Sequence, residues 1–351
     1  MPQPDKVADR AGEGQRLMTI CNACRYCEGF CDVFPAMERR LEFSAADINY
    51  LANLCHNCAE CYYACQYAPP HEFAVNVPQV FAEIRAQSYQ KYAWPKYVRV
   101  NAWMAVAVGL IVVAGLAGAR TAANANFYGV IPHDVMIATF GLAAVLIISV
   151  HIMGLLRFWR ESGEKRPALP VLLRAARDVL SLKNLDSHGA GCTYPDERHS
   201  QARRRFHHFT FYGFLLCFAS TTVAAIYHFT GRIAPYPYLS LPVALGTLGG
   251  IGLLIGPAGL YGLKRRRDIN IVDTQQDGMD LSFLVLLFLT SLTGLLLLVL
   301  RQSAAMGMLL RIHLAIVLGL FLTLPYGKFV HGIYRSAALV RSVLETARGE
   351  H

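Results

Sequence analysis

Eight cysteines near the amino terminus have the residue type and the spacing of metal ligands. They fall in two runs, CNACRYCEGFC over residues 21–31 and CHNCAECYYAC over residues 55–65. Successive cysteines are three, three and four residues apart, so a short looping backbone can aim three thiolates at three irons of one cubane. A proline usually follows the fourth cysteine of such runs. Asp32 and Gln66 stand there instead, but that proline binds no metal, so the runs still predict two [4Fe–4S] clusters.

The fourth cysteine of each run is expected to bind the cluster that the other run holds, as in two-cluster ferredoxins. The first cluster would take Cys21, Cys24, Cys27 and Cys65, and the second would take Cys55, Cys58, Cys61 and Cys31. A zinc ribbon is the structural alternative, but one zinc ion takes four thiolates and leaves the other cysteines without a role. Two zinc sites remain open as an alternative. Cys192 and Cys217 are isolated in the sequence, and Cys217 fits core packing.

Six histidines form the second group with metal-binding chemistry, and they lie in or beside long apolar segments: His151, His207, His208, His228, His313 and His331. An ionisable side chain within a membrane span is a functional candidate by default. His313 and His331 are 18 residues apart, which on one helix is five turns and places them on one face, about 27 Å apart. His207 and His228 lie within about 60° of one face, whereas His208 and His228 are nearly opposite.

Chain direction pairs these histidines by depth. The third and sixth apolar segments run in opposite directions, so His207 or His208 would be level with His331, and His228 with His313. Haem iron commonly takes axial histidine, and the pattern predicts one or two b-type haems between the two helices. The alternative for each histidine alone is a place at the level of the lipid headgroups.

His151, Arg311 and Lys328 are weaker candidates for cofactor contacts. His151 matches only the cytoplasmic group in depth, and is interpreted as a substitute haem ligand, a quinone contact or a packed core residue. Arg311 and Lys328 lie close to His313 and His331 in the sequence, and are expected to contact a haem propionate or a quinone.

The elements that must position these residues follow from the hydropathy of the chain. It is 54% hydrophobic and 16% charged, against about 25% charged residues in a typical soluble protein. Residues 1–96 are polar, and six later segments are long enough to span a bilayer, which takes about 20 residues of helix. These segments are 98–118, 134–157, 207–230, 239–262, 280–300 and 309–333. The predicted fold is mainly α, with a small helical two-cluster ferredoxin-like domain before a six-helix transmembrane bundle.

The predicted domain boundaries follow the same division. Residues 1–17 are expected to be a disordered tail without a secretory signal, 18–96 the cluster domain and 97–334 the membrane domain, with a cytoplasmic tail over 335–351. The connection over 158–206 contains a predicted amphipathic helix at 167–185, on the membrane surface or under the cysteine domain. The glycines of LGTLGGIGLLIGPAGLYG do not form GxGxxG, and they fit close helix packing.

Basic residues set the expected orientation. The formal charge is +9, and the arginines flank the apolar segments, which favours membrane topology over nucleic-acid binding. The connections 158–206 and 263–279 and the carboxyl-terminal tail are rich in arginine, and they alternate with loops that have little charge. Both termini and the cysteine domain are therefore expected in the cytoplasm. Thiols stay reduced there, which favours metal binding over disulfides.

Clusters in the cytoplasm and haem in the membrane would form a path for single electrons. The sequence has no recognisable nucleophile, acid–base pair or nucleotide motif. We therefore expect an electron-transfer subunit without substrate chemistry of its own, rather than a self-contained enzyme. Its electron donor would be another protein and its acceptor a lipid-soluble carrier, with quinone the obvious choice.

The stretches CNACRYCEGFC, CHNCAECYYACQYAPPHEF and RRRFHHFTFYGFLLCFAS resemble the tricarballylate (or citrate) utilization protein B family, from about residue 18 onward. The resemblance implies a multi-pass protein of the bacterial inner membrane. It would reoxidise a cytoplasmic FAD-dependent enzyme, tricarballylate dehydrogenase, and pass electrons through two [4Fe–4S] clusters and haem to quinone. The membrane half is also similar to haem-b subunits of nitrate reductase and heterodisulfide reductase. That similarity implies His208, His228, His313 and His331 as ligands, whereas the helical-face argument favours His207.

Three other functions fit the sequence less well. A heterodisulfide- or sulfite-linked quinol oxidoreductase subunit would work beside cysteine-rich catalytic motifs, which this sequence lacks. A membrane redox sensor would need an output domain, for which the carboxyl-terminal tail is too short. A transporter would need polar residues or broken helices at the midplane, and the apolar segments have few of these features.

Overall fold

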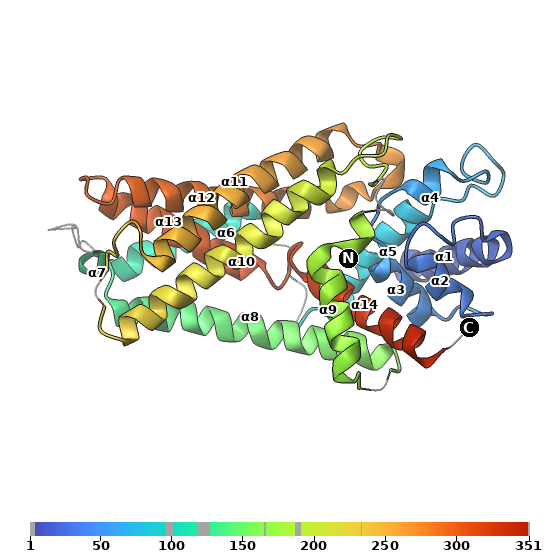
Figure 1. Cartoon of the computed structure of the whole chain (residues 1–351), viewed down its shortest axis with the longest axis horizontal. Coiled ribbons are helices and arrows are strands. Elements are labelled where there is room, and N and C mark those ends of the chain that lie inside the picture. Colours follow the sequence, from blue (N-terminus) through green and yellow to red (C-terminus); the bar gives the residue numbers. More distant parts are fainter. Residues whose placement is uncertain are drawn as a thin grey trace.

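The computed structural model describes residues 4–95, 98, 101–117, 127–164, 166–186, 191–232 and 234–349. In these ranges the chain is helical and contains no β-strand; residues 192 and 200 form one isolated bridge. Figure 1 shows the cysteine-rich helices gathered at one end of the molecule, with the long apolar helices extending to the other end. The predicted order of a cysteine-rich region followed by apolar helices is confirmed.

Five helices build the cysteine-rich region: α1 (Pro4–Cys24), α2 (Val33–Glu38), α3 (Ala45–Leu54), α4 (Glu60–Tyr63) and α5 (Val77–Tyr92). Ser44 starts α3 with a capping box, in which its hydroxyl and the Asp47 carboxylate each accept a backbone N–H. The Asn76 side chain caps α5 by accepting a hydrogen bond from the Gln79 backbone N–H. Residues 4–17 of the predicted disordered tail belong to α1, which begins at Pro4 and buries Leu17 completely. Residues 1–3 of that tail lie outside the described residues.

Five later helices are long and apolar enough to cross a membrane: α8 (His133–Glu161), α10 (Ala202–Phe229), α11 (Leu241–Arg266), α12 (Asp277–Val299) and α13 (Met306–Thr323). Such a set is typical of a multi-pass membrane protein. Helix α6 (Ala102–Ala117) is also apolar but has only 16 residues. At 1.5 Å per residue it covers about 24 Å, less than the roughly 30 Å of a hydrocarbon core. The short helix α7 (Phe127–Val130) leads into α8.

Glycines let α10 and α11 approach closely. A Cβ atom built on Gly249 would lie 2.8 Å from the backbone of Cys217 and of Gly213, and one on Gly252 would lie 3.0 Å from the Phe209 carbonyl oxygen. Only glycine fits such contacts. The packing role predicted for this glycine-rich stretch is thereby confirmed, and Cys217 lies in the same interface.

The sixth predicted span, 309–333, is wrong at its carboxyl end. Helix α13 ends at Thr323, and a separate helix, α14 (Val330–Arg348), begins after a turn that contains Pro325. Proline lacks an N–H and its ring clashes with the preceding helical turn, so it is a natural place for the break. His313 and His331 therefore lie on different helices, and the prediction that they share one helical face fails.

Helix α14 does not form a loose tail, since it packs against the cysteine-rich region. It buries Tyr334 and Ala338 in the core of that region. On its other side it meets α9 (Leu169–Ser181), which runs across the direction of α8 in Figure 1. Helix α9 turns Val171 and Ala175 toward α14 and leaves Leu169 and Leu173 exposed. The amphipathic segment thus supports α14, and its exposed leucines suit a membrane surface.

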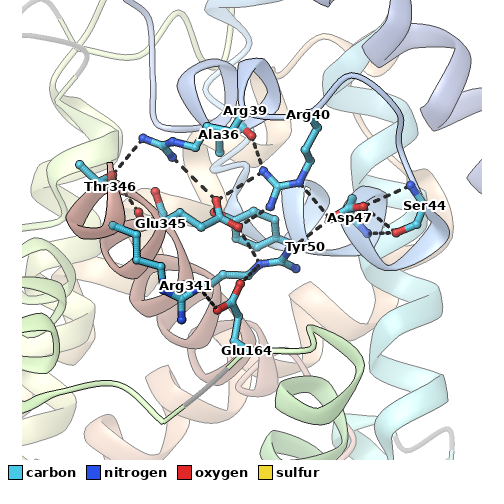
Figure 2. A network of polar contacts seen from close by, with 12 residues as sticks. Ala36, Arg39, Arg40, Ser44, Asp47, Tyr50, Glu164, Arg341, Glu345 and Thr346 are labelled. Atoms are coloured by element: carbon cyan, nitrogen blue, oxygen red, sulfur yellow. Dashed lines mark hydrogen bonds and ion pairs between the residues drawn. The ribbon is translucent and has the colours of Figure 1, made fainter. Parts of the chain in front are cut away.

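A buried ionic network fixes the end of α14 to α3, and Figure 2 shows it around Glu345. The Glu345 side chain is 2% exposed and is paired with Arg40 and Arg341. Arg341 also pairs with Asp47 at 3.1 Å and with Glu164, after α8, at 3.5 Å. The network therefore connects the cysteine-rich region, the end of an apolar helix and α14.

Replacing Glu345 with alanine is expected to destabilise the protein by about 3 kcal/mol, because Arg40 and the buried Arg341 both lose a buried carboxylate partner. Thermal denaturation of the full chain in detergent measures this as a lower Tm. The control is Glu13→Ala, which removes a partly exposed pair with Arg16 and should cost less than about 1 kcal/mol. Equal effects of the two substitutions would show that the buried network does not stabilise the fold.

Candidate metal centres and the histidine pair

The first cysteine-lined cavity lies at the end of α1. Cys21 and Cys24 occupy the last turn of that helix, and Arg25 then takes a left-handed conformation (φ 54°) that turns the chain back. The cavity has a volume of about 260 Å³, and its cysteines are Cys21, Cys24, Cys27, Cys61 and Cys65. Four of these five are the set predicted for the first cluster.

The second cavity is smaller and lies between α3 and α4. Its cysteines are Cys31, Cys55, Cys58 and Cys61, which are the set predicted for the second cluster. Asn57 (φ 55°) and Ala59 (φ 71°) both take left-handed conformations, which non-glycine residues rarely adopt. Such strained positions cluster at functional sites. The structure thus brings the fourth cysteine of each run to the cavity of the other, with Cys61 on the wall between them.

The thiols in these cavities are poorly suited to exist as free thiolates. Burial, followed by the nearby Cys27 and Cys65, raises the pKa of Cys21 to about 12. Burial likewise raises the pKa of Cys27 and of Cys58 to about 12. A metal centre would have to displace these protons, since metals bind the thiolate. The donor sets fit [4Fe–4S] clusters, and the volume of the first cavity, about 260 Å³, fits one as well. No three potential ligands among the described residues lie close enough for a single ion.

Asp32, which replaces the usual proline, attaches the loop after α9 to the first run. Its carboxylate accepts a hydrogen bond from Asn184 Nδ2 at 2.9 Å and forms an ion pair with Lys183 at 3.3 Å. Further along this loop, Thr193 donates to the Cys58 carbonyl oxygen at 3.2 Å. Cys192 is fully buried in the same cluster of side chains as Cys58. The described part of this loop therefore packs against Cys58, in the wall of the second cavity.

His207 on α10 and His331 on α14 face each other. Their ring centroids are 6.2 Å apart and their planes are inclined by 71°. An imidazole nitrogen lies about 2 Å from a bound metal such as zinc, so two rings on opposite sides of one metal have centroids about 6 Å apart. His331 Nδ1 donates to the Lys328 carbonyl oxygen at 2.5 Å, which leaves Nε2 available. His207 Nδ1 is buried without a hydrogen-bond partner. The pair fits axial ligation of a haem iron.

His208 lies away from this pair. Its ring is 5.7 Å from Tyr212 and near the end of α9, on another side of α10 from His207. The structure thus places His207, which the helical-face argument favoured, beside His331. The residue implied by the resemblance to haem-b subunits, His208, is not beside it.

The second predicted pair, His228 and His313, is not brought together as a pair of facing rings. His228 stacks on His133, with centroids 3.5 Å apart and planes inclined by 28°, and Tyr128 lies at 5.6 Å. A stack this close leaves no space for a metal between the rings. His313 Nδ1 is 3.0 Å from the Thr293 hydroxyl. Sequence reasoning missed His133, although its place at the start of an apolar helix level with His228 was a usable signal.

The three weaker candidates have distinct surroundings. His151 Nε2 is buried without a hydrogen-bond partner, and its ring lies 5.5 Å from Phe329 in the turn before α14. Lys328 pairs with Asp280 at 2.9 Å, near the histidine pair. Arg311 lies on α13, two residues before His313.

Sequence reasoning also missed His56 and the arginines around it. His56 is buried at the second cavity, with Nδ1 2.8 Å from the Leu54 carbonyl oxygen. Burial, followed by the charges of Arg335 and Arg203, lowers its pKa well below the usual value, so it is neutral at pH 7. These residues are far apart in the sequence, and no local pattern connects them.

Comparison with known proteins agrees with this organisation. Residues 14–91 match the family model "Citrate utilization protein B Fer4-like domain", and residues 98–350 match "Citrate utilization protein B". A curated relative, the citrate utilization protein B of Escherichia coli, is 51% identical over 98% of this chain and 95% of its own length. No solved structure matches the chain. A Fer4-like domain with eight cysteines indicates iron–sulfur clusters. On these matches, the chain belongs to the citrate utilization protein B family.

Proposed function

We propose that this protein carries single electrons from a cytoplasmic flavoprotein dehydrogenase, through two [4Fe–4S] clusters and b-type haem, to quinone. The observation that carries the proposal is the His207–His331 pair, whose two helices are hydrogen-bonded to the wall of the second cysteine-lined cavity through Arg203 and Arg335. Donor groups for two kinds of redox cofactor thus meet at the junction between the cysteine-rich region and the apolar helices. The clusters and the haem would each accept and release one electron at a time.

Within this proposal the side chains hold and insulate the cofactors. The two crosswise sets of cysteines would bind the clusters, and the described part of the loop after α9 packs against Cys58 of the second set. His207 and His331 would hold one haem, and the hydrogen bond from His331 to the Lys328 carbonyl orients the His331 ring. The contacts of His228 and His313 give no support to a second haem, so we propose one.

The proposed setting is the bacterial inner membrane. Helices α8, α10, α11, α12 and α13 would cross it, and the shorter α6 would complete a six-helix bundle. The arginine-rich connections favour an orientation in which both termini and the cysteine-rich region face the cytoplasm. This orientation puts the clusters where a soluble dehydrogenase can reach them and leaves the bundle in contact with lipid-soluble quinone.

The family suggests which kind of dehydrogenase would be the donor. The relative is named for citrate utilization, and the resemblance described above implies an FAD-dependent enzyme that oxidises tricarballylate. Such an enzyme releases two electrons per substrate, and this protein would transfer them singly to quinone, which takes up two electrons and two protons.

The test is the cofactor content of the full-length protein purified under anaerobic conditions. We expect about eight cluster irons and eight acid-labile sulfides per chain, together with one b-type haem. Cys217→Ser serves as a control, since Cys217 packs between α10 and α11 away from both cavities, and it should keep the full content. Full cluster content without any haem would contradict the membrane half of the proposal.

A further inference from the structure

Two arginines connect the second cysteine run to the histidine pair. Arg203 precedes His207 by four residues on α10, and Arg335 follows His331 by four residues on α14. Four residues are about one helical turn, so each arginine lies on the same helical face as its histidine. Both arginines reach the backbone of residues 55–57, in the wall of the second cavity.

The contacts are direct and come from both helices. Arg203 donates from Nη1 to the Asn57 carbonyl oxygen at 2.7 Å and from Nη2 to the His56 carbonyl oxygen at 2.9 Å. Arg335 donates from Nη2 to the Cys55 carbonyl oxygen at 2.8 Å. Arg85, on α5, reaches the same Cys55 oxygen at 3.2 Å. Three cationic groups thus converge on one short loop that carries two of the cysteines of the second cavity.

The first run has different surroundings. Tyr26 beside its cavity is 67% exposed, and Phe73 nearby is 41% exposed. Arg25 within the run donates its Nε–H to the Asn22 carbonyl oxygen of the same run. The first cavity therefore opens toward the surface of the cysteine-rich region, whereas the second is joined to α10 and α14.

We propose that Arg203 and Arg335 are positioning residues, which hold the second cysteine run against the His207–His331 pair and set the order of electron flow. Electrons enter at the first cluster from the soluble donor and leave the second cluster for the haem. This inference rests on the proposed function.

The electron step at this junction is simple to balance. One electron leaves the second cluster and reduces the ferric iron held by the two histidines to the ferrous state, without forming or breaking a bond. Two features of the arginines favour it. Their hydrogen bonds fix the separation of the two centres, and their positive charge stabilises the more negative, reduced state of the cluster.

The test uses Arg203→Met and Arg335→Met in the full-length protein with its cofactors. A redox titration monitored by electron paramagnetic resonance measures the potential of each cluster. The signal that is lost in Cys55→Ser identifies the second cluster. We expect each variant to lower the potential of the second cluster and to leave that of the first unchanged. Stopped-flow reduction of the haem should slow at least tenfold, while haem content stays at the wild-type level.

Conservative and distant variants separate positioning from general damage. Arg335→Lys keeps the charge and should restore the potential of the second cluster. Arg10→Met removes a partly exposed cation that pairs with Glu83 and lines neither cavity, so it should leave both clusters and the haem rate unchanged. If Arg335→Met fails to assemble, Arg203→Met tests the same claim from the other helix. A wild-type potential and rate in Arg203→Met, or a shift confined to the first cluster, would overturn the inference. A wild-type protein without haem would instead contradict the proposed function.

Discussion

Replacing either His207 or His331 with alanine is expected to abolish the b-type haem, reducing the haem bound per chain at least tenfold. On the proposed function each residue would hold the haem iron, and the two rings lie 6.2 Å apart, a separation that suits two imidazoles on one iron. The clusters should remain, since neither histidine lines either cysteine cavity. The measurement is the dithionite-reduced absorption spectrum of each purified variant, with iron and sulfide content determined in parallel.

His208→Ala is the matched control for His207→Ala. The two histidines are adjacent on α10, but His208 lies near Tyr212, away from His331. We expect the His208 variant to keep its haem. The opposite result, with haem lost in His208→Ala and kept in His207→Ala, would support the ligand set implied by the haem-b resemblance and would require α10 to rotate relative to this structure.

The second large effect is expected at the cysteines that cross between runs. Cys31→Ser should remove the second cluster and leave the first, although Cys31 belongs to the first run. Iron content in the clusters should fall from about eight to about four per chain. Reduction of the haem by dithionite-reduced clusters should fall to the background rate, because the cluster beside the histidine pair is the one lost.

Cys65→Ser and Cys192→Ser complete this experiment. Cys65→Ser should remove the first cluster and leave the second, which is the mirror result. Cys192 is fully buried next to Cys58 but belongs to neither predicted set, so Cys192→Ser should keep both clusters. If Cys31→Ser removes the cluster held by Cys21, Cys24 and Cys27, the runs do not exchange ligands.

The cysteine sets and the apolar helices could be predicted because their signals are local. The spacing of each run fixes how three thiolates converge, and a stretch of apolar residues fixes a long helix without knowledge of its neighbours. The angle around the helix axis between His207 and His228 depends only on their spacing, so it is local in the same sense. It favoured His207 over His208, and the structure places His207 beside His331.

The remaining features depend on contacts that the sequence does not display. The hydrophobic stretch over 309–333 looked continuous, yet Pro325 lies in the turn that separates α13 from α14. The predicted pairing of His228 with His313 depended on that continuity. Helix α14 packs on the cysteine-rich region, and the ionic network around Glu345 holds it there (Figure 2). The partners in this network are far apart in the sequence, so the sequence did not predict the packing.

The arginines at residues 203 and 335 show the same limit. In the sequence they are part of basic stretches that set membrane orientation. In the structure they bind backbone oxygens 146 to 280 residues away. Their role follows from tertiary packing alone, which no spacing pattern could reveal.

The most direct test of the whole account is an anaerobic rapid-mixing experiment with the purified full-length protein. Clusters and haem are first reduced with a stoichiometric amount of dithionite, and the protein is then mixed with ubiquinone-1. We predict that the reduced haem band disappears as the quinone is reduced. The clusters should then be reoxidised by electron transfer through the haem, and their absorption should return to that of the oxidised form. His207→Ala should block both changes. A haem that stays reduced in the presence of ubiquinone-1, or clusters that reoxidise equally fast in His207→Ala, would contradict the proposed path.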